Sequence, residues 1–94
     1  MTIYFAPEAE EDFAVLIGYL HERSPSAAAD LGRRVFAIID RLASGELEGA
    51  RTTLESGDAV RSWAVPPVRV YYQRRVDALW VIRIYHQAQQ PITR

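Results

Sequence analysis

Apolar residues recur every three to four positions in two neighbouring stretches of the chain, and this spacing predicts two amphipathic helices. Pro7 suits the first turn of a helix, and the acidic residues after it favour the positive end of the helix dipole, so we expect a first helix over residues 7–23. Ser24 followed by a proline repeats the start signal, and Gly45 supplies a stop for a second helix over residues 25–43. The tight connection predicts an antiparallel helical hairpin. The two apolar stripes comprise Ala9, Phe13, Leu16, Ile17 and Leu20, and then Ala28, Leu31, Val35, Ile38, Ile39 and Leu42.

Short runs rich in β-branched and aromatic residues predict strands on both sides of the helical hairpin. One such run opens the chain at residues 3–5, and another spans residues 59–64 before two prolines. Residues 68–75 and 79–86 predict a β-hairpin that turns at residues 76–78. Residues 45–58 contain three glycines and show no clear period, so we expect a loop there with little structure of its own.

The final hairpin is predicted to have two different faces, because successive side chains of a strand point in opposite directions. Val68, Val70, Tyr72, Trp80, Ile82 and Ile84 form the apolar set and are expected to cover the helices. By the same alternation His86 shares this face, which predicts a partly buried, structural histidine. The opposite face presents Arg69, Tyr71, Arg83 and Tyr85, with Arg61 expected nearby. The predicted fold is α+β in the order β-α-α-β-β-β, with the helical hairpin packed on one face of a small, mainly antiparallel sheet.

Charge is distributed unevenly along the chain. Residues 1–58 carry five Arg against eleven acidic residues, whereas residues 59–94 carry six Arg against one Asp, although the total is only −1. This polarity favours a partner that is acidic where it meets the C-terminal half. A length of 94 residues with 49% hydrophobic residues is expected to form one domain over residues 1–94 with a real core.

Composition excludes several kinds of chemistry. All eleven basic residues are Arg, so no Lys serves as a base, and the absence of Cys excludes thiol catalysis and disulfides. With two His and no Cys, we expect no metal site. The sequence shows no signal segment and no apolar run near 18 residues, so we expect a cytoplasmic protein without a membrane span. The pI of about 6.1 argues against direct binding of free nucleic acid.

The order of these segments resembles the ParE/RelE superfamily of bacterial toxins, and more closely its ParE branch. The opening run over residues 5–13, which leads to Tyr19, is similar to the family's apolar-x-Pro-x-Ala-x-x-Asp-Leu start. The likeness extends over nearly the whole chain. It continues through Ser24-Pro25 with Ala28, Leu42 before a Gly-containing loop, Val60-Arg61, residues 68–72 and residues 80–86.

The resemblance implies a toxin that a cognate ParD-like antitoxin neutralises. ParE-type members poison DNA gyrase by trapping its cleaved DNA complex without any catalytic residue or cofactor, whereas RelE-type members cleave mRNA in the ribosome with a cluster of Lys, Arg and Tyr or His. The absence of Lys favours the ParE type, and the ribonuclease and an inactive toxin fold that only binds a partner stay as alternatives. The residues expected to form a groove for the target or the antitoxin are Arg61, Arg69, Tyr71, Arg83 and Tyr85.

The end of the last predicted strand is a further candidate position. RelE-like enzymes place acid–base groups where this chain has Tyr85 and His86. ParE members often have Arg three residues after the His, where this chain has Gln89. His86 and Gln89 are therefore a candidate C-terminal functional position, and Gln89 is the reason to keep the inactive fold among the alternatives.

Overall fold

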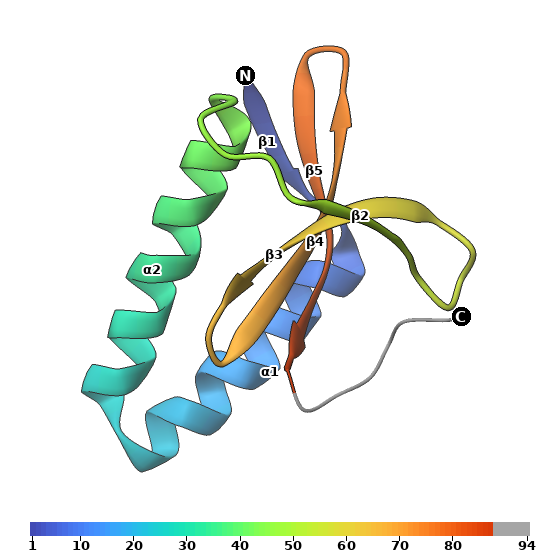
Figure 1. The fold of residues 1–94 in the computed structure, drawn as a ribbon. Helices are drawn as coiled ribbons and strands as arrows, with labels where there is room; N and C mark the ends of the chain where they lie inside the picture. The colour runs from blue at the N-terminus through green and yellow to red at the C-terminus, as the bar shows by residue number, and fades with distance from the viewer. Residues whose placement is uncertain (88–94) are drawn as a thin grey trace.

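The computed structural model describes residues 1–87, which form two helices and a five-stranded sheet (Figure 1). The strand order is β1-β5-β4-β3-β2, with β1 parallel to β5 and all other neighbouring strands antiparallel. The α+β architecture predicted from the sequence is confirmed, with one strand more than expected. The elements are β1 (Thr2–Phe5), α1 (Pro7–Arg23), α2 (Pro25–Ala43), β2 (Ala50–Thr53), β3 (Ala59–Val65), β4 (Val68–Arg75) and β5 (Ala78–His86).

Both helices begin and end where the sequence predicts. Ser24 caps α2, because its Oγ accepts a hydrogen bond from the backbone N–H of Ala27 at 3.2 Å. At the other end Gly45 adopts a φ of 84°, a conformation that glycine reaches without steric cost, and its N–H donates to the Leu42 carbonyl. The start signal Ser24-Pro25 and the stop signal Ser44-Gly45 therefore set the length of α2.

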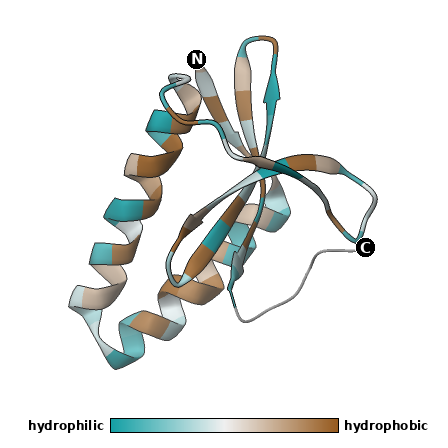
Figure 2. Ribbon diagram, in the orientation of Figure 1, coloured by the Kyte–Doolittle hydropathy of each residue, from teal (hydrophilic) through white to brown (hydrophobic). Residues whose placement is uncertain are grey.

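The core lies between α2 and the helix-facing side of the sheet, which we call the inner face. Leu31, Val35, Ile39 and Leu42 of α2 are at most 1% exposed. Figure 2 shows hydrophobic segments on α2 and on the strands beside it. Ala9 of α1 is fully buried, while the rest of the α1 stripe packs against the core and stays partly exposed. The sheet contributes Val65, Val68, Val70, Tyr72, Leu79, Val81 and Ile84.

The expectation of a loop with little structure of its own over residues 45–58 is wrong for part of this segment, because Ala50–Thr53 forms β2. This strand pairs with β3, with Arg51 opposite Arg61 and Thr53 opposite Ala59. β2 is four residues long, lies at the edge of the sheet and has no fully buried residue. A short strand exposed on both faces carries no alternation of apolar and polar residues, which is why the pattern missed it.

The predicted faces of β5 are wrong for Trp80 and Ile82 and right for Ile84. Leu79 and Val81 enter the core, whereas Trp80 lies on the opposite, outer face and stacks on Tyr4 with ring centroids 4.9 Å apart. Tyr72 lies opposite Val81 but Tyr71 lies opposite Arg83, so β5 contains one extra residue. This β-bulge shifts the alternation and returns Ile84 to the core. The same shift leaves Ile82 on the outer face, where it packs with Tyr85 and Tyr71.

His86 is exposed at the end of β5, opposite Val68, so the expected partial burial is not observed. Within residues 1–87, no helix has the length and apolar character needed to cross a membrane.

Candidate functional site

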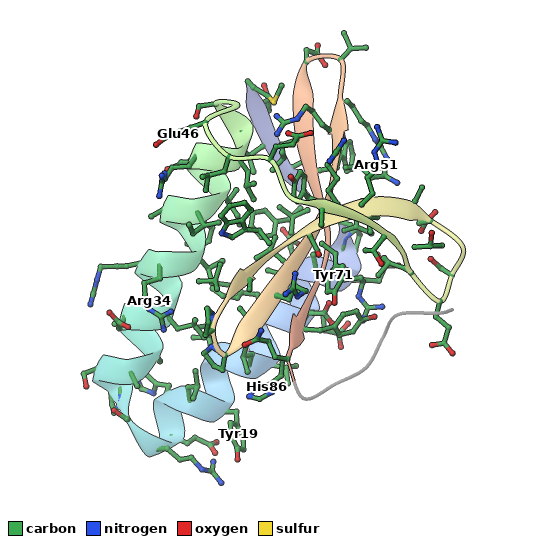
Figure 3. All side chains as sticks on the ribbon, in the orientation of Figure 1. Tyr19, Arg34, Glu46, Arg51, Tyr71 and His86 are labelled. Carbon is green, nitrogen blue, oxygen red and sulfur yellow. The ribbon has the colours of Figure 1, made fainter. Side chains whose placement is uncertain are left out.

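The outer face of the sheet carries a small second cluster centred on Tyr71 (labelled in Figure 3). Tyr71 and Tyr85 contact each other edge to face, with ring centroids 5.7 Å apart. Leu54, from the turn between β2 and β3, and Val60 of β3 bury the Tyr71 ring. The outer face at this point is therefore covered by the β2–β3 turn and not a bare surface.

Arg69 belongs to the same face. Its Nη1 donates a hydrogen bond to Ser62 Oγ at 3.0 Å, and the strand pairing places it opposite Tyr85. The prediction that Arg69, Tyr71 and Tyr85 lie together is confirmed. Among residues 1–87, Arg69 has no carboxylate within 4.0 Å, so its positive charge is not neutralised by a salt bridge.

Arg83 lies at the border between the outer face and α1. Its Nε and Nη2 donate to the two carboxylate oxygens of Asp12 at 2.8 and 2.9 Å, a bidentate pair. Asp12 Oδ2 also accepts the backbone N–H of Ile84 at 3.0 Å. The Arg83 guanidinium lies 4.5 Å from the centre of the Tyr85 ring. Arg83 is thus held in place by two hydrogen bonds to Asp12 and by its contact with the Tyr85 ring.

The position of Asp12 follows from where β1 ends. β1 pairs with β5 only as far as Phe5 opposite Val81, and the N–H of Ala6 donates to the Val81 carbonyl before α1 begins. Within residues 1–87 no strand pairs with this edge of β5 beyond Val81, and Asp12 supplies the acceptor for the Ile84 N–H instead. The sequence explained the acidic residues near the start of α1 by helix electrostatics and missed this role. No local pattern links two residues 71 positions apart.

The environment changes the acidity of three side chains at this site. The hydrogen bonds that Arg83 donates to the Asp12 carboxylate raise the pKa of Arg83, which stays charged. Burial raises the pKa of Tyr71, and burial also raises that of Tyr85, although the neighbouring arginines oppose both changes. At neutral pH both phenols are therefore protonated and are poor general bases.

Arg61 does not join this group, which corrects the prediction that it lies near Arg69 and Arg83. It lies on the inner side of β3, where its Nη1 donates to the Gly49 carbonyl at 2.7 Å and its Nε pairs with Glu48 at 2.9 Å. Because residues of β3 alternate, Arg61 shares a face with Trp63 and not with Ser62. Glu48 and Gly49 directly precede β2, and because this strand was not predicted, the sequence did not show that they lie beside Arg61.

His86 lines a groove of about 520 Å³ between α1 and the end of β5. Tyr19 and His86 lie near the same end of the molecule in Figure 3, and Val15, Leu16 and three acidic residues complete much of the lining. The other candidate of the C-terminal position, Gln89, falls outside the described residues. Within residues 1–87, no three His, Cys, Asp or Glu side chains come close enough to hold a metal ion.

Comparison with known proteins agrees with this geometry. Residues 3–91 match the family model described as the ParE toxin of the type II toxin-antitoxin system, parDE. The fold is similar to that of a solved structure described as the chromosomal ParDE TA system from P. aeruginosa. The TM-score is 0.72, the identity is 13%, and the match covers 92% of this chain and 95% of that chain. No curated protein sequence matches the chain. Because the family model spans almost the whole sequence, the chain belongs to the ParE toxin family of type II toxin–antitoxin systems.

Proposed function

We propose that this chain is a cytoplasmic toxin that inhibits DNA gyrase by binding it and trapping its cleaved DNA complex. The observation that carries the proposal is the family match over residues 3–91. The outer face around Arg69 and Tyr85 is the proposed contact surface for gyrase or for the antitoxin. Arg69 is the candidate with the most charge to offer, because its observed partner is a neutral hydroxyl.

The chemistry of the site supports binding in preference to RNA cleavage. Cleavage next to a 2′-OH needs a base, an acid and a cation aimed at the phosphate. Here Asp12 already neutralises Arg83, and burial raises the pKa of Tyr71 and Tyr85, so both remain protonated. The chain contains no Lys to replace them. We therefore propose that the toxin is not an enzyme.

A ParD-like antitoxin is the proposed inhibitor. The structural relative is described as a ParDE system, in which a toxin and an antitoxin occur together. The acidic partner implied by the arginine-rich C-terminal half of this chain fits an antitoxin segment that covers Arg69. Binding there would block the surface proposed for gyrase.

Supercoiling of a relaxed plasmid by purified gyrase tests the proposal. Increasing amounts of this protein are expected to inhibit supercoiling and to accumulate linear DNA, which reports trapped cleavage. Arg69→Ala is expected to weaken both effects about tenfold or more if its charge contacts the target. The matched control is Arg33→Ala, which removes an arginine from the exposed side of α2, where the side chain is 72% exposed.

Full gyrase activity in the presence of folded protein would contradict gyrase inhibition. Ribosome-dependent mRNA cuts in that case would assign the protein to the RelE type. A tight complex with an antitoxin but no inhibition of either target would identify an inactive binding module. Equal activity of Arg69→Ala and wild type would exclude Arg69 from the gyrase contact.

A further inference from the structure

A second groove lies at the opposite end of the sheet, formed by β2, β3 and the last part of β4. Its volume is about 670 Å³, and among residues 1–87 four of the residues that line it are arginines and none is Asp or Glu. They are Arg51, Arg61, Arg74 and Arg75. Figure 3 shows Arg51 beside β2, away from Tyr19 and His86. The groove is thus separate from the cluster around Tyr71 and from the groove beside His86.

The arginines of this groove carry more charge than their neighbours neutralise. The Glu48 carboxylate accepts from Arg61 Nε and from Arg74 Nη2, each at 2.9 Å, so one negative charge serves two guanidinium groups. Arg51 and Arg75 have no carboxylate within 4.0 Å in the part of the chain that the structure describes. Arg75 instead donates to Gln73 Oε1 at 2.8 Å. Four guanidinium groups and one carboxylate leave three positive charges.

The rest of the lining favours phosphate over a peptide. Thr52, Thr53 and Gln73 add hydroxyl and amide groups, which commonly contact phosphate and sugar oxygens. A peptide partner needs an apolar anchor, yet the large exposed hydrophobic residues lie outside this groove. Tyr72, the one aromatic residue that the described part of the chain adds to the lining, is fully buried.

The burial of Tyr72 also decides between kinds of nucleic acid. Proteins that bind single strands offer exposed aromatic rings on which bases stack. This groove offers cations and polar groups, and the partly exposed ring beside it, Trp80, is already stacked with Tyr4 and lies 4.4 Å from the Arg75 guanidinium, which suits the regular backbone of a duplex.

We propose that the groove lined by Arg51, Arg61, Arg74 and Arg75 binds the phosphate backbone of double-stranded DNA without reading its sequence. The inference goes beyond gyrase inhibition and does not depend on it. It revises the expectation, based on the pI of the whole chain, that the protein does not bind nucleic acid directly. Most of the acidic residues behind that pI belong to α1 and α2, whereas the groove is built on the strands.

Fluorescence anisotropy of a labelled duplex, titrated with the full-length protein, measures this interaction. Three neutralised phosphates predict a slope of about −2.7 for log K against log salt, or about a 40-fold loss of affinity between about 50 and 200 mM salt. The double variant Arg51→Gln/Arg75→Gln is expected to reduce the slope by about 2. The control Arg23→Gln/Arg33→Gln removes the same charge from the helices and is expected to keep the slope.

A variant that removes a negative charge, and is expected to strengthen binding, tests the groove without removing an arginine. Glu48→Gln frees Arg61 and Arg74 from their shared carboxylate and is expected to tighten duplex binding and to steepen the slope by about 1. A circular dichroism spectrum identical to that of the wild type confirms that each variant is folded.

Three results would overturn the inference. The first is no duplex binding by the wild type at about 50 mM salt. The second is equal weakening by the groove variant and by the helix control. The third is tighter binding of a single strand or of polyglutamate than of the duplex, which would assign the groove to a different partner.

Discussion

The two ends of the sheet use arginine in opposite ways. Beside α1, Arg83 forms a bidentate pair with Asp12, and the two side chains are only 32% and 16% exposed. Beside β2, two arginines share the half-exposed carboxylate of Glu48, and Arg51 and Arg75 have no such partner among residues 1–87.

The difference separates charge that stabilises the fold from charge that remains for a partner. A partly buried, bidentate ion pair that also binds a backbone N–H holds a helix against a strand. Because its two charges cancel, it attracts few ions from solvent. An exposed arginine without a carboxylate contributes little to stability and attracts anions. We therefore expect substitutions of charged residues beside α1 to change mainly stability and those beside β2 to change mainly binding.

Asp12→Ala is expected to have the largest effect on stability. It removes the acceptor of Arg83 and of the Ile84 N–H, both partly buried, and should lower the free energy of unfolding by about 2–3 kcal/mol. Urea denaturation followed by circular dichroism measures the loss. Arg75→Ala, at the other end of the sheet, is the control and should change stability by less than about 1 kcal/mol, because it loses an exposed contact with the Trp80 ring.

The double variant Asp12→Ala/Arg83→Met separates the loss of the ion pair from the cost of leaving the partly buried Arg83 guanidinium without its carboxylate. If the stranded guanidinium causes most of the loss, adding the second substitution should recover part of it. Equal destabilisation by Asp12→Ala and Arg75→Ala would remove the distinction between the two ends.

Gly49→Ala tests whether close backbone packing, and not a buried ion pair, stabilises the β2 end of the sheet. A Cβ at position 49 would overlap the backbone carbonyl of Ser62, and the Gly49 N–H donates to Tyr72 Oη at 2.7 Å. Because a strand backbone cannot move away as a flexible side chain can, the loss should be about 1–3 kcal/mol. Denaturant unfolding measures it, with Gly32→Ala on α2, where a Cβ meets no atom within 4 Å, as the control. A Gly49→Ala protein as stable as the wild type would contradict this account.

Much of the fold could be predicted because its signals are local. Caps, prolines and a helical period lie within a few residues of the elements they define, and both helices follow them. β2 has no local signal, since pairing with β3 creates it. The β-bulge in β5 likewise depends on a match between two strands, and so simple alternation predicts the wrong face for Trp80 and Ile82.

The candidate site could be predicted only where residues share one hairpin. Arg69, Tyr71 and Tyr85 lie on β4 and β5 and come together as alternation requires. Arg61 and Arg83 take partners from other elements, Glu48 and Asp12, that no spacing in the sequence connects to them. The pattern therefore identified the arginines but not which of them are neutralised.

Arg51→Glu is expected to make the protein slightly more stable and a weaker binder. Arg51 lies directly opposite Arg61 in the β2–β3 pair, and like charges in that position repel each other. Replacing one by a carboxylate should raise the free energy of unfolding by about 0.2–1 kcal/mol, and it should weaken duplex binding by removing a cation from the groove. Denaturation and anisotropy measure the two effects. A gain in stability without a loss of DNA affinity would separate Arg51 from the proposed DNA site.

The smallest expected effect concerns the cluster between the two ends and appears only at alkaline pH. Burial raises the pKa of Tyr71 and of Tyr85 in the folded protein, so the fold retains these protons longer than the unfolded chain does. Their contribution is fully present below the ordinary tyrosine pKa of about 10 and is lost as the pH rises through the raised values. The urea midpoint should therefore fall between about pH 9 and 11, and less steeply in Tyr71→Phe/Tyr85→Phe. Tyr19→Phe, at a half-exposed position on α1, should keep the wild-type decline. Identical declines in all three proteins would show that Tyr71 and Tyr85 do not cause the loss of stability at alkaline pH.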